Sequence, residues 1–183
     1  VETLQDGAAE DPEIRTKFLD IIAIEAARLK RLIEDILIIS DIENKREVNT
    51  DSDINVRESI EEILASMAPI IEAKKVRIAA HYAYEIYIGG NPDRFKQLMV
   101  NLIENAVKYS HDGGTVTINA ERKEGKVYII VRDEGIGISG ENLPRIFERF
   151  YRVDKSRSQK VGGTGLGLAI VKHIAALFEA EIK

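Results

Sequence analysis

Cysteine is absent from the 183-residue sequence, and so are the long apolar runs of membrane-spanning proteins. Without cysteine the chain can hold neither a disulfide scaffold nor a thiolate metal site, and a reducing compartment is compatible with it. A bilayer-spanning helix needs about 20 apolar residues in succession. No run approaches that length and no signal peptide opens the chain, so we expect it to be soluble as given.

A dense cluster of basic residues is also missing, which disfavours nucleic acid as a partner. The chain holds 26 Lys and Arg against 31 Asp and Glu, a net charge of −5, and the basic residues are dispersed. Hydrophobic residues make up 44% of the 183 residues, enough for a core in one domain with an appendage or in two small domains.

The first long element predicted is a helix from Glu13 to about Asn44, a stretch without Gly or Pro. Apolar residues recur in it near heptad spacing, at Phe18, Ile22, Leu29, Leu32, Ile36 and Ile39. Because one helix cannot bury such a stripe on itself, we expect a partner helix from this chain or another. The alternative is a spacer helix between domains.

A polar linker from Asn44 to Asp53 separates this helix from a second domain with mixed α and β elements. The predicted elements are a helix over 56–72, two strands within 76–88, a helix over 92–110, a β-hairpin of 115–122 and 127–133, and a last helix over 167–178. Asn91 is suited to cap the helix that begins at Pro92.

Polar side chains line one face of the helix predicted over 92–110. At about 100° per residue, Asn101, Asn105 and Lys108 share this face, with Glu104 beside them. Amide oxygens are hard ligands for Mg²⁺ and a lysine ammonium neutralises phosphate, so the row fits a polyphosphate with its metal. A solvated helix face explains the segment equally well.

Asp133 ends the predicted hairpin and is followed by Gly135 and Gly137. A carboxylate only accepts hydrogen bonds, so it suits the exocyclic amino group of adenine, whereas the carbonyl of guanine would leave it unpaired. The alternative is an ordinary Asp-Gly turn.

Four glycines within residues 162–167 lead directly into the last predicted helix. Free N–H groups at a helix start, backed by the helix dipole, bind phosphate. The segment is not a dinucleotide fingerprint, because no strand precedes it, and it is not a P-loop, because no Gly-Lys-Ser/Thr follows. A flexible surface loop is the alternative.

In their order and spacing these segments resemble the nucleotide-binding boxes of sensor histidine kinases, within the superfamily that includes gyrase B, mismatch-repair ATPases and heat-shock chaperone ATPases. The N box, first glycine box, F box and second glycine box correspond to residues 97–110, 133–137, 146–152 and 163–167. The resemblance covers about 53–178. Residues 29–37 resemble the second helix of the family's dimerisation and phosphotransfer hairpin.

The resemblance implies an α/β (α+β) two-layer sandwich, with helices on one face of a mixed, mainly antiparallel sheet, preceded by a long helix from a helical hairpin. Residues 1–48 would be a partial dimerisation and histidine-phosphotransfer region, and 53–183 an ATP-binding catalytic domain truncated at its C-terminus. The acceptor motif, a His followed by Glu and then Arg-Thr-Pro, is absent and is expected before Val1. The three histidines, which lack that context, are His81, His111 and His173.

The resemblance also implies roles for individual residues. Asn105 would hold Mg²⁺, Tyr109 would line the adenine pocket and Asp133 would take the adenine amino group. The implied catalytic residues are Asn101, Lys108 and Arg152. Further implied nucleotide contacts are Lys108, Gly135, Gly137, Phe147, Tyr151, Arg152, Gly163, Thr164, Gly165, Leu166 and Gly167. Phe147 and Phe150 would anchor a mobile lid, whose basic residues are Lys155, Arg157 and Lys160.

With ATP and Mg²⁺ as cofactors, the implied reaction passes the γ-phosphate to a His on the missing upstream helix and then to an Asp of a response-regulator receiver domain. The fragment is expected to bind ATP without phosphorylating itself. It would form a homodimer through the N-terminal helix and be the cytoplasmic domain of a membrane sensor.

Two other functions fit the same residues. A gyrase-like ATPase is disfavoured, because Asn101 stands where a water-activating Glu is expected. A nucleotide-gated dimerisation or binding module without transferase activity would keep the same nucleotide contacts.

Overall fold

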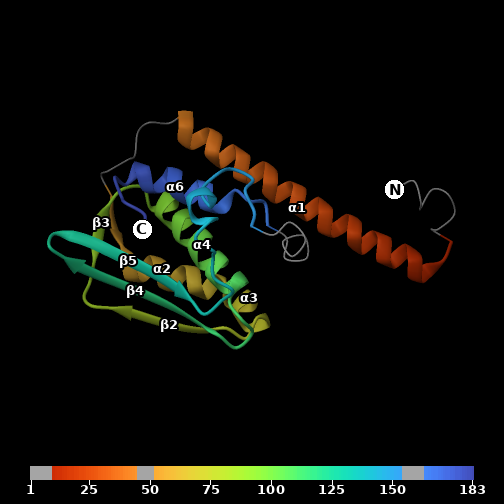
Figure 1. The fold of residues 1–183 in the computed structure, drawn as a ribbon, viewed down its shortest axis with the longest axis horizontal. Helices are drawn as coiled ribbons and strands as arrows, with labels where there is room; N and C mark the ends of the chain where they lie inside the picture. The colour runs from red at the N-terminus through yellow and green to blue at the C-terminus, as the bar shows by residue number, and fades with distance from the viewer. Residues whose placement is uncertain (1–9, 45–51, 154–162) are drawn as a thin grey trace.

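The computed structural model describes residues 10–44, 52–153 and 163–183. The long helix α1 (Pro12–Asn44) lies along one side of a mixed α/β body (Figure 1). The other helices are α2 (Val56–Ser66), α3 (Ala68–Ala73), α4 (Pro92–Tyr109), the short 3₁₀ helix η2 (Leu143–Arg145) and α6 (Gly167–Leu177). The described strands are β1 (Asp53–Asn55), β2 (Arg77–Tyr82), β3 (Tyr87–Gly89), β4 (Thr115–Lys123) and β5 (Lys126–Asp133).

The main sheet has the strand order β2-β4-β5, and β1 and β3 form a separate antiparallel pair. Strand β4 pairs in parallel with β2 and antiparallel with β5. The predicted hairpin is confirmed, and Glu124 and Gly125 at its tip have φ values of 52° and 77°. Two consecutive residues with positive φ give the turn the twist that suits a tight hairpin.

Helices α2 and α4 cover one face of the main sheet, and the core lies between these layers (Figure 1). Residues of β4 alternate between partly exposed and buried, as expected for a strand covered on one face. The fully buried side chains of this core include Ile60, Ile63, Met99, Ile103, Val107, Val116 and Ile118. Each contributes about 1.5–3 kcal/mol by leaving water. The predicted two-layer sandwich is confirmed.

Two predicted boundaries were wrong. The helix predicted over 56–72 breaks into α2 and α3, with Met67 between them and Pro69 in the first turn of α3. Proline has no N–H for the hydrogen-bond ladder of the preceding helix, so that helix ends before it. The predicted linker also overlaps β1, because Asp53 is paired with Gly89 in β3.

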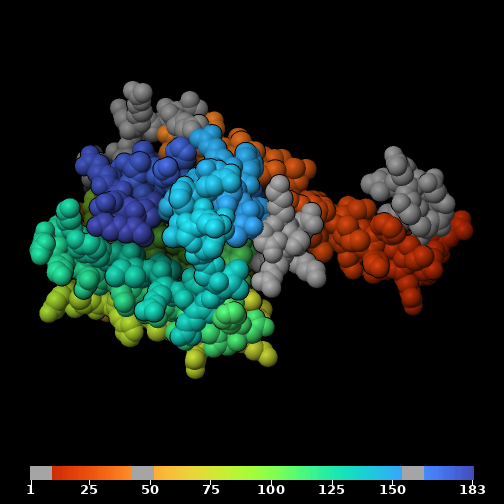
Figure 2. All heavy atoms as spheres, viewed as in Figure 1, coloured from red at the N-terminus to blue at the C-terminus, as the bar shows by residue number. Residues whose placement is uncertain are grey.

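Helix α6 lies between α1 and α4 (Figure 1). Ile39 and Ile42 of α1 are 4% and 6% exposed and pack with Leu166, Ile170 and Ile174. The predicted partner helix for this half of α1 therefore comes from the same chain. The other half extends beyond the body (Figure 2), and Ile22 and Leu29 are exposed there. None of the helices in the described part of the chain combines the length and apolar content needed to cross a membrane.

Candidate functional site

Helix α4 presents the predicted row of amides and lysine. The Asn91 side chain accepts a hydrogen bond from the Arg94 N–H at 3.1 Å, which confirms the predicted N-cap. Phe95, Met99, Ile103 and Val107 turn into the core, so Asn101, Asn105 and Lys108 lie on the partly exposed face. The Asn101 amide nitrogen donates to the Gln97 carbonyl at 2.9 Å, which fixes the orientation of that amide.

The second glycine box lies directly on this face of α4. A Cβ atom at Gly167 would be 2.9 Å from Asn101 Oδ1 and 3.7 Å from Asn105 Nδ2. A Cβ at Gly163 would be 3.0 Å from Lys108 Nζ. The folded chain therefore brings together the amides, the lysine and the glycine loop, and the absence of side chains at these glycines permits the close approach.

The F box joins the same loop through its backbone. The Phe150 N–H donates to the Gly165 carbonyl at 2.9 Å, and a Cβ at Gly165 would be 3.0 Å from the Phe150 Cα. Gly165 has a φ of 76°, which favours glycine. Of the two phenylalanines predicted to anchor a lid, Phe150 is 58% exposed and Phe147 is partly buried.

The first glycine box is tied to the end of α4. The Ile136 N–H donates to the Tyr109 carbonyl at 3.3 Å. A Cβ at Gly135 would lie 2.3 Å from that carbonyl oxygen and 2.5 Å from Asp133 Oδ1. Only glycine fits there, and the exposed Asp133 carboxylate is thereby held beside the end of α4. Gly137 has a φ of 66° with open space where a Cβ would stand.

A hollow of about 340 Å³ opens beside these segments. Its lining residues are Lys74, Lys108, Tyr109, Ser110, His111, Asp112 and Ile136. Lys108 and Tyr109 thus line a cavity, and the Lys108 ammonium lies 5.6 Å from the Tyr109 ring centroid. Asp133 is outside this lining, so the structure places it near the cavity and not in its wall.

Three basic side chains, Lys108, Arg31 and Arg152, and one carboxylate, Glu104, lie close enough to influence one another. Burial lowers the pKa of the Lys108 ammonium, and the Glu104 carboxylate partly offsets that shift. The guanidinium groups of Arg31 and Arg152 lower this pKa further. Arg152 Nη2 is buried and has no hydrogen-bond partner among the described residues. A bound anion would compensate both groups.

Helix α1 contributes two contacts to this site that the sequence analysis missed. Arg31 Nη1 donates to Glu104 Oε1 at 3.1 Å, and the Thr164 hydroxyl donates to Asp35 Oδ2 at 2.6 Å. Thr164 Oγ1 also accepts from the Leu166 N–H at 3.3 Å. Burial raises the pKa of Asp35, although the Thr164 hydrogen bond acts to lower it. Arg31 and Asp35 stand between the apolar positions of the helix, and nothing in the neighbouring sequence indicated which residues they would contact.

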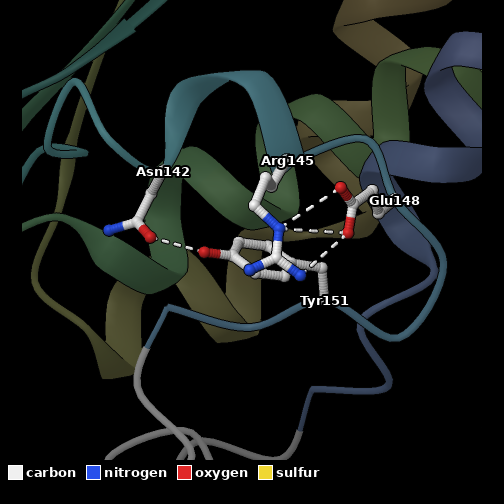
Figure 3. A network of polar contacts seen from close by, with 4 residues as sticks. All are labelled: Asn142, Arg145, Glu148 and Tyr151. Atoms are coloured by element: carbon white, nitrogen blue, oxygen red, sulfur yellow. Dashed lines mark hydrogen bonds and ion pairs between the residues drawn. The ribbon is translucent and has the colours of Figure 1, made fainter.

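The Tyr151 side chain contacts residues a few positions earlier in the chain, Asn142 and Arg145 (Figure 3). Its hydroxyl donates to Asn142 Oδ1, and the Arg145 guanidinium lies 4.3 Å from its ring centroid. Arg145 in turn pairs with Glu148 at 3.1 Å. The Tyr151 hydroxyl is thus directed at Asn142, whereas the charge of the neighbouring Arg152 lowers the pKa of Lys108.

The remaining predicted residues fall into two groups. Lys155, Arg157 and Lys160 of the predicted lid lie outside the described residues. His81 and His111 are exposed, and His173 Nε2 lies 3.2 Å from Arg149 Nη2.

The donor set on α4 restricts which metal it could take. The described residues contain no group of three or more His, Cys, Asp or Glu side chains that could hold a metal ion by themselves. Amide oxygens such as that of Asn105 suit Mg²⁺, which uses few protein ligands and completes its shell with phosphate oxygens and water.

The comparisons with known sequences give the family. Residues 90–183 match the family described as histidine kinase-, DNA gyrase B-, and HSP90-like ATPase. Sensor histidine kinase WalK of Bacillus subtilis (strain 168) is 38% identical over 191 residues, which cover 100% of this chain and 30% of WalK. Sensor-like histidine kinase SenX3 of Mycobacterium tuberculosis (strain ATCC 25618 / H37Rv) is 32% identical over 97% of this chain and 43% of SenX3. The chain thus spans less than half of these relatives.

Solved structures agree with the sequence relatives. The catalytic domain of histidine kinase ThkA has a TM-score of 0.60 and 27% identity, over 67% of this chain and 78% of that one. Full-length ShkA in complex with AMPPNP has a TM-score of 0.74 and 26% identity, over 91% of this chain and 34% of that one. ThkA in complex with the response regulator TrrA has a TM-score of 0.66 and 26% identity, over 78% and 42%. The family match covers more than half of the 183 residues, so the chain belongs to the histidine kinase-, DNA gyrase B- and HSP90-like ATPases, with sensor histidine kinases as its homologues.

Proposed function

We propose that this chain is the ATP-binding catalytic core of a sensor protein-histidine kinase. The observation that carries the proposal is the packing of the second glycine box against α4, where a Cβ atom at Gly163 or Gly167 would lie within 4 Å of the Lys108, Asn101 or Asn105 side chain. Helix α6 begins at Gly167, so its free N–H groups and positive dipole end adjoin the same three polar side chains. This arrangement suits a triphosphate.

Each group on this face has a distinct task in that proposal. Lys108 and Arg152 supply positive charge for the phosphates, and Asn101 and Asn105 supply amide groups. Asn105 would hold Mg²⁺, which when bound neutralises charge on the β- and γ-phosphates. Catalysis by the chain's own residues would then consist of positioning and charge stabilisation.

The base would be recognised near the first glycine box. Asp133 is exposed and lies beside the end of α4, where its carboxylate can accept from an adenine amino group. Tyr109 lines the adjacent hollow. Guanine presents a carbonyl in place of that amino group, so adenine is the preferred base.

The finer division of the chain belongs to the same proposal. Residues 1–48 would be part of a dimerisation and phosphotransfer region that forms a homodimer through α1, and 53–183 the catalytic domain. The acceptor His would lie in another part of the parent protein, because none of the histidines of this chain is followed by the Glu and Arg-Thr-Pro of the acceptor motif. The phosphate would pass on to an Asp of a response regulator, a class of partner that ThkA binds. The parent would be a membrane sensor with this part in the cytoplasm.

Calorimetric titration with a non-hydrolysable ATP analogue, with and without Mg²⁺, tests the proposal. We expect Mg²⁺-dependent binding that Asp133→Asn weakens about tenfold or more. The asparagine loses the negative charge, and it places an NH₂ donor where the carboxylate had only acceptors for the adenine amino group. Asp93→Asn is the matched control, since Asp93 is an exposed carboxylate in the first turn of α4, at the other end of the helix.

Equal binding by Asp133→Asn and the control would show that Asp133 does not read the base. No binding by a folded wild-type chain would favour an interaction module without nucleotide-dependent transfer. If binding holds, acid-labile phosphate on the parent protein, lost with Asn105→Ala, would test transfer to histidine.

A further inference from the structure

Two charged side chains of α1 reach the nucleotide site from outside the residues that match the ATPase family. Arg31 is 73 positions from Glu104, and Asp35 is 129 positions from Thr164, yet each pair is in hydrogen-bond contact. Helix α1 also packs its Ile39 and Ile42 on α6, the helix that begins at the glycine loop. Helix α1 therefore contacts both elements that adjoin the proposed phosphate site, α4 through Arg31 and the glycine loop through Asp35.

Glu104 is an acidic residue that α4 itself places in that site. It is the only acidic residue between Asn101 and Lys108, and it lies on the same face of α4. A carboxylate at this position repels the phosphates of a nucleotide. Arg31, at 3.1 Å, supplies the opposite charge from α1 and lies close enough to Lys108 to affect its titration.

As a stabilising ion pair alone, this contact would have little value. The Arg31 and Glu104 side chains are 54% and 33% exposed, and exposed pairs contribute about 0–1 kcal/mol. The ion pair should matter more for the binding of a multiply charged ligand than for stability, because removing Arg31 leaves one additional net negative charge next to the phosphates. The energy of that change scales with the ligand's charge.

We propose that Arg31 is a positioning residue of the nucleotide site, which cancels the charge of Glu104 and so makes the docked α1 favour nucleotides with more phosphate charge. The inference rests on the proposed ATP-binding function. By linkage, a bound triphosphate would favour docking of α1 by the same factor. Helix α1 would thus be coupled to the occupancy of the site through a charge that it carries.

The test compares Arg31→Gln with Arg28→Gln in the whole chain. Arg28 is one turn away on α1 and pairs at 3.2 Å with Glu25 of the same helix, so its loss changes the net charge equally but away from α4. Circular dichroism checks that each variant is folded. Titrations use the Mg²⁺ complexes of a non-hydrolysable ATP analogue and of ADP.

We expect Arg31→Gln to weaken the triphosphate by about fivefold and the diphosphate by about twofold, with Arg28→Gln near wild type. Raising the salt from about 50 mM to about 300 mM should shrink the differences, since screening shortens the reach of the charge. Glu104→Gln added to Arg31→Gln should restore the wild-type ratio of the two affinities.

Three results would overturn the inference: equal losses in the Arg31 and Arg28 variants, equal losses for triphosphate and diphosphate, or no rescue by Glu104→Gln. A folded wild-type chain that binds neither nucleotide would instead refute the proposed function on which the inference rests.

Discussion

Gly135 is the position where a single methyl group should most directly disturb the site. Its Cβ in Gly135→Ala would stand 2.3 Å from the Tyr109 carbonyl oxygen and 2.5 Å from Asp133 Oδ1. Real Cβ atoms essentially never come closer than 3.0 Å, so the Tyr109 carbonyl must retreat by at least 0.7 Å. That carbonyl accepts the Ile136 N–H, and Ser110 forms a β-bridge with Gly135.

The expected cost follows from these contacts. Overpacking against backbone costs about 1–3 kcal/mol, and loss of the hydrogen bond from Ile136 adds about 1 kcal/mol. The sum is about 2–4 kcal/mol, which for a chain of this size lowers Tm by roughly 5–12 °C. The Asp133 side chain must also move, so nucleotide affinity should fall together with stability.

Thermal melts followed by circular dichroism measure the first effect, and calorimetric titration measures the second. Gly140→Ala is the matched control, because a Cβ there meets nothing within 4 Å and its backbone is not left-handed. A Tm of Gly135→Ala equal to that of Gly140→Ala would refute the close approach of the first glycine box to the end of α4.

Two further predictions concern the packing of α6 and the charge of Lys108. Ile170 is 0% exposed and lies in one core cluster with Ile39 and Ile42, so Ile170→Ala should cost about 2–5 kcal/mol in urea unfolding, whereas Leu37→Ala, at a 62% exposed position, should be near neutral; equal costs would contradict the burial of Ile170 in this cluster. Burial lowers the pKa of the Lys108 ammonium below its ordinary 10.5, so folding disfavours its charged form; this cost to stability is absent well above pH 10.5, grows as pH falls through 10.5 and is complete below the lowered pKa. Bound phosphate should raise that pKa again, so binding should take up protons at pH values between the lowered pKa and the raised one, and Lys108→Gln should abolish that uptake; a binding enthalpy that is independent of the buffer's ionisation enthalpy over the whole alkaline range would contradict this.

Local patterns predicted those parts of the protein whose cause is local. The row of Asn101, Asn105 and Lys108 follows from the helical period. The cap at Asn91 follows from a side chain next to a proline at the first helical position. The hairpin follows from alternation around a glycine turn, and each of these was found where the sequence indicated it. The break before Pro69 was missed, although proline is a local signal that should have divided the helix predicted over 56–72.

The short strand β1 and the approach of α1 to the site have no such local signal. Three residues are too few to show alternation, so β1 is recognised only by its pairing with β3. The contacts of Arg31 with Glu104 and of Asp35 with Thr164 join positions 73 and 129 residues apart.

The sequence by itself determined the nucleotide-binding boxes, because each is a short segment whose residue types and spacing carry its chemistry. Only the tertiary structure decided that the second glycine box seats on α4, that Tyr151 is held by Asn142, and that α1 brings charge to the site. Such contacts depend on how layers pack around a shared core, and packing is set by many distant side chains together.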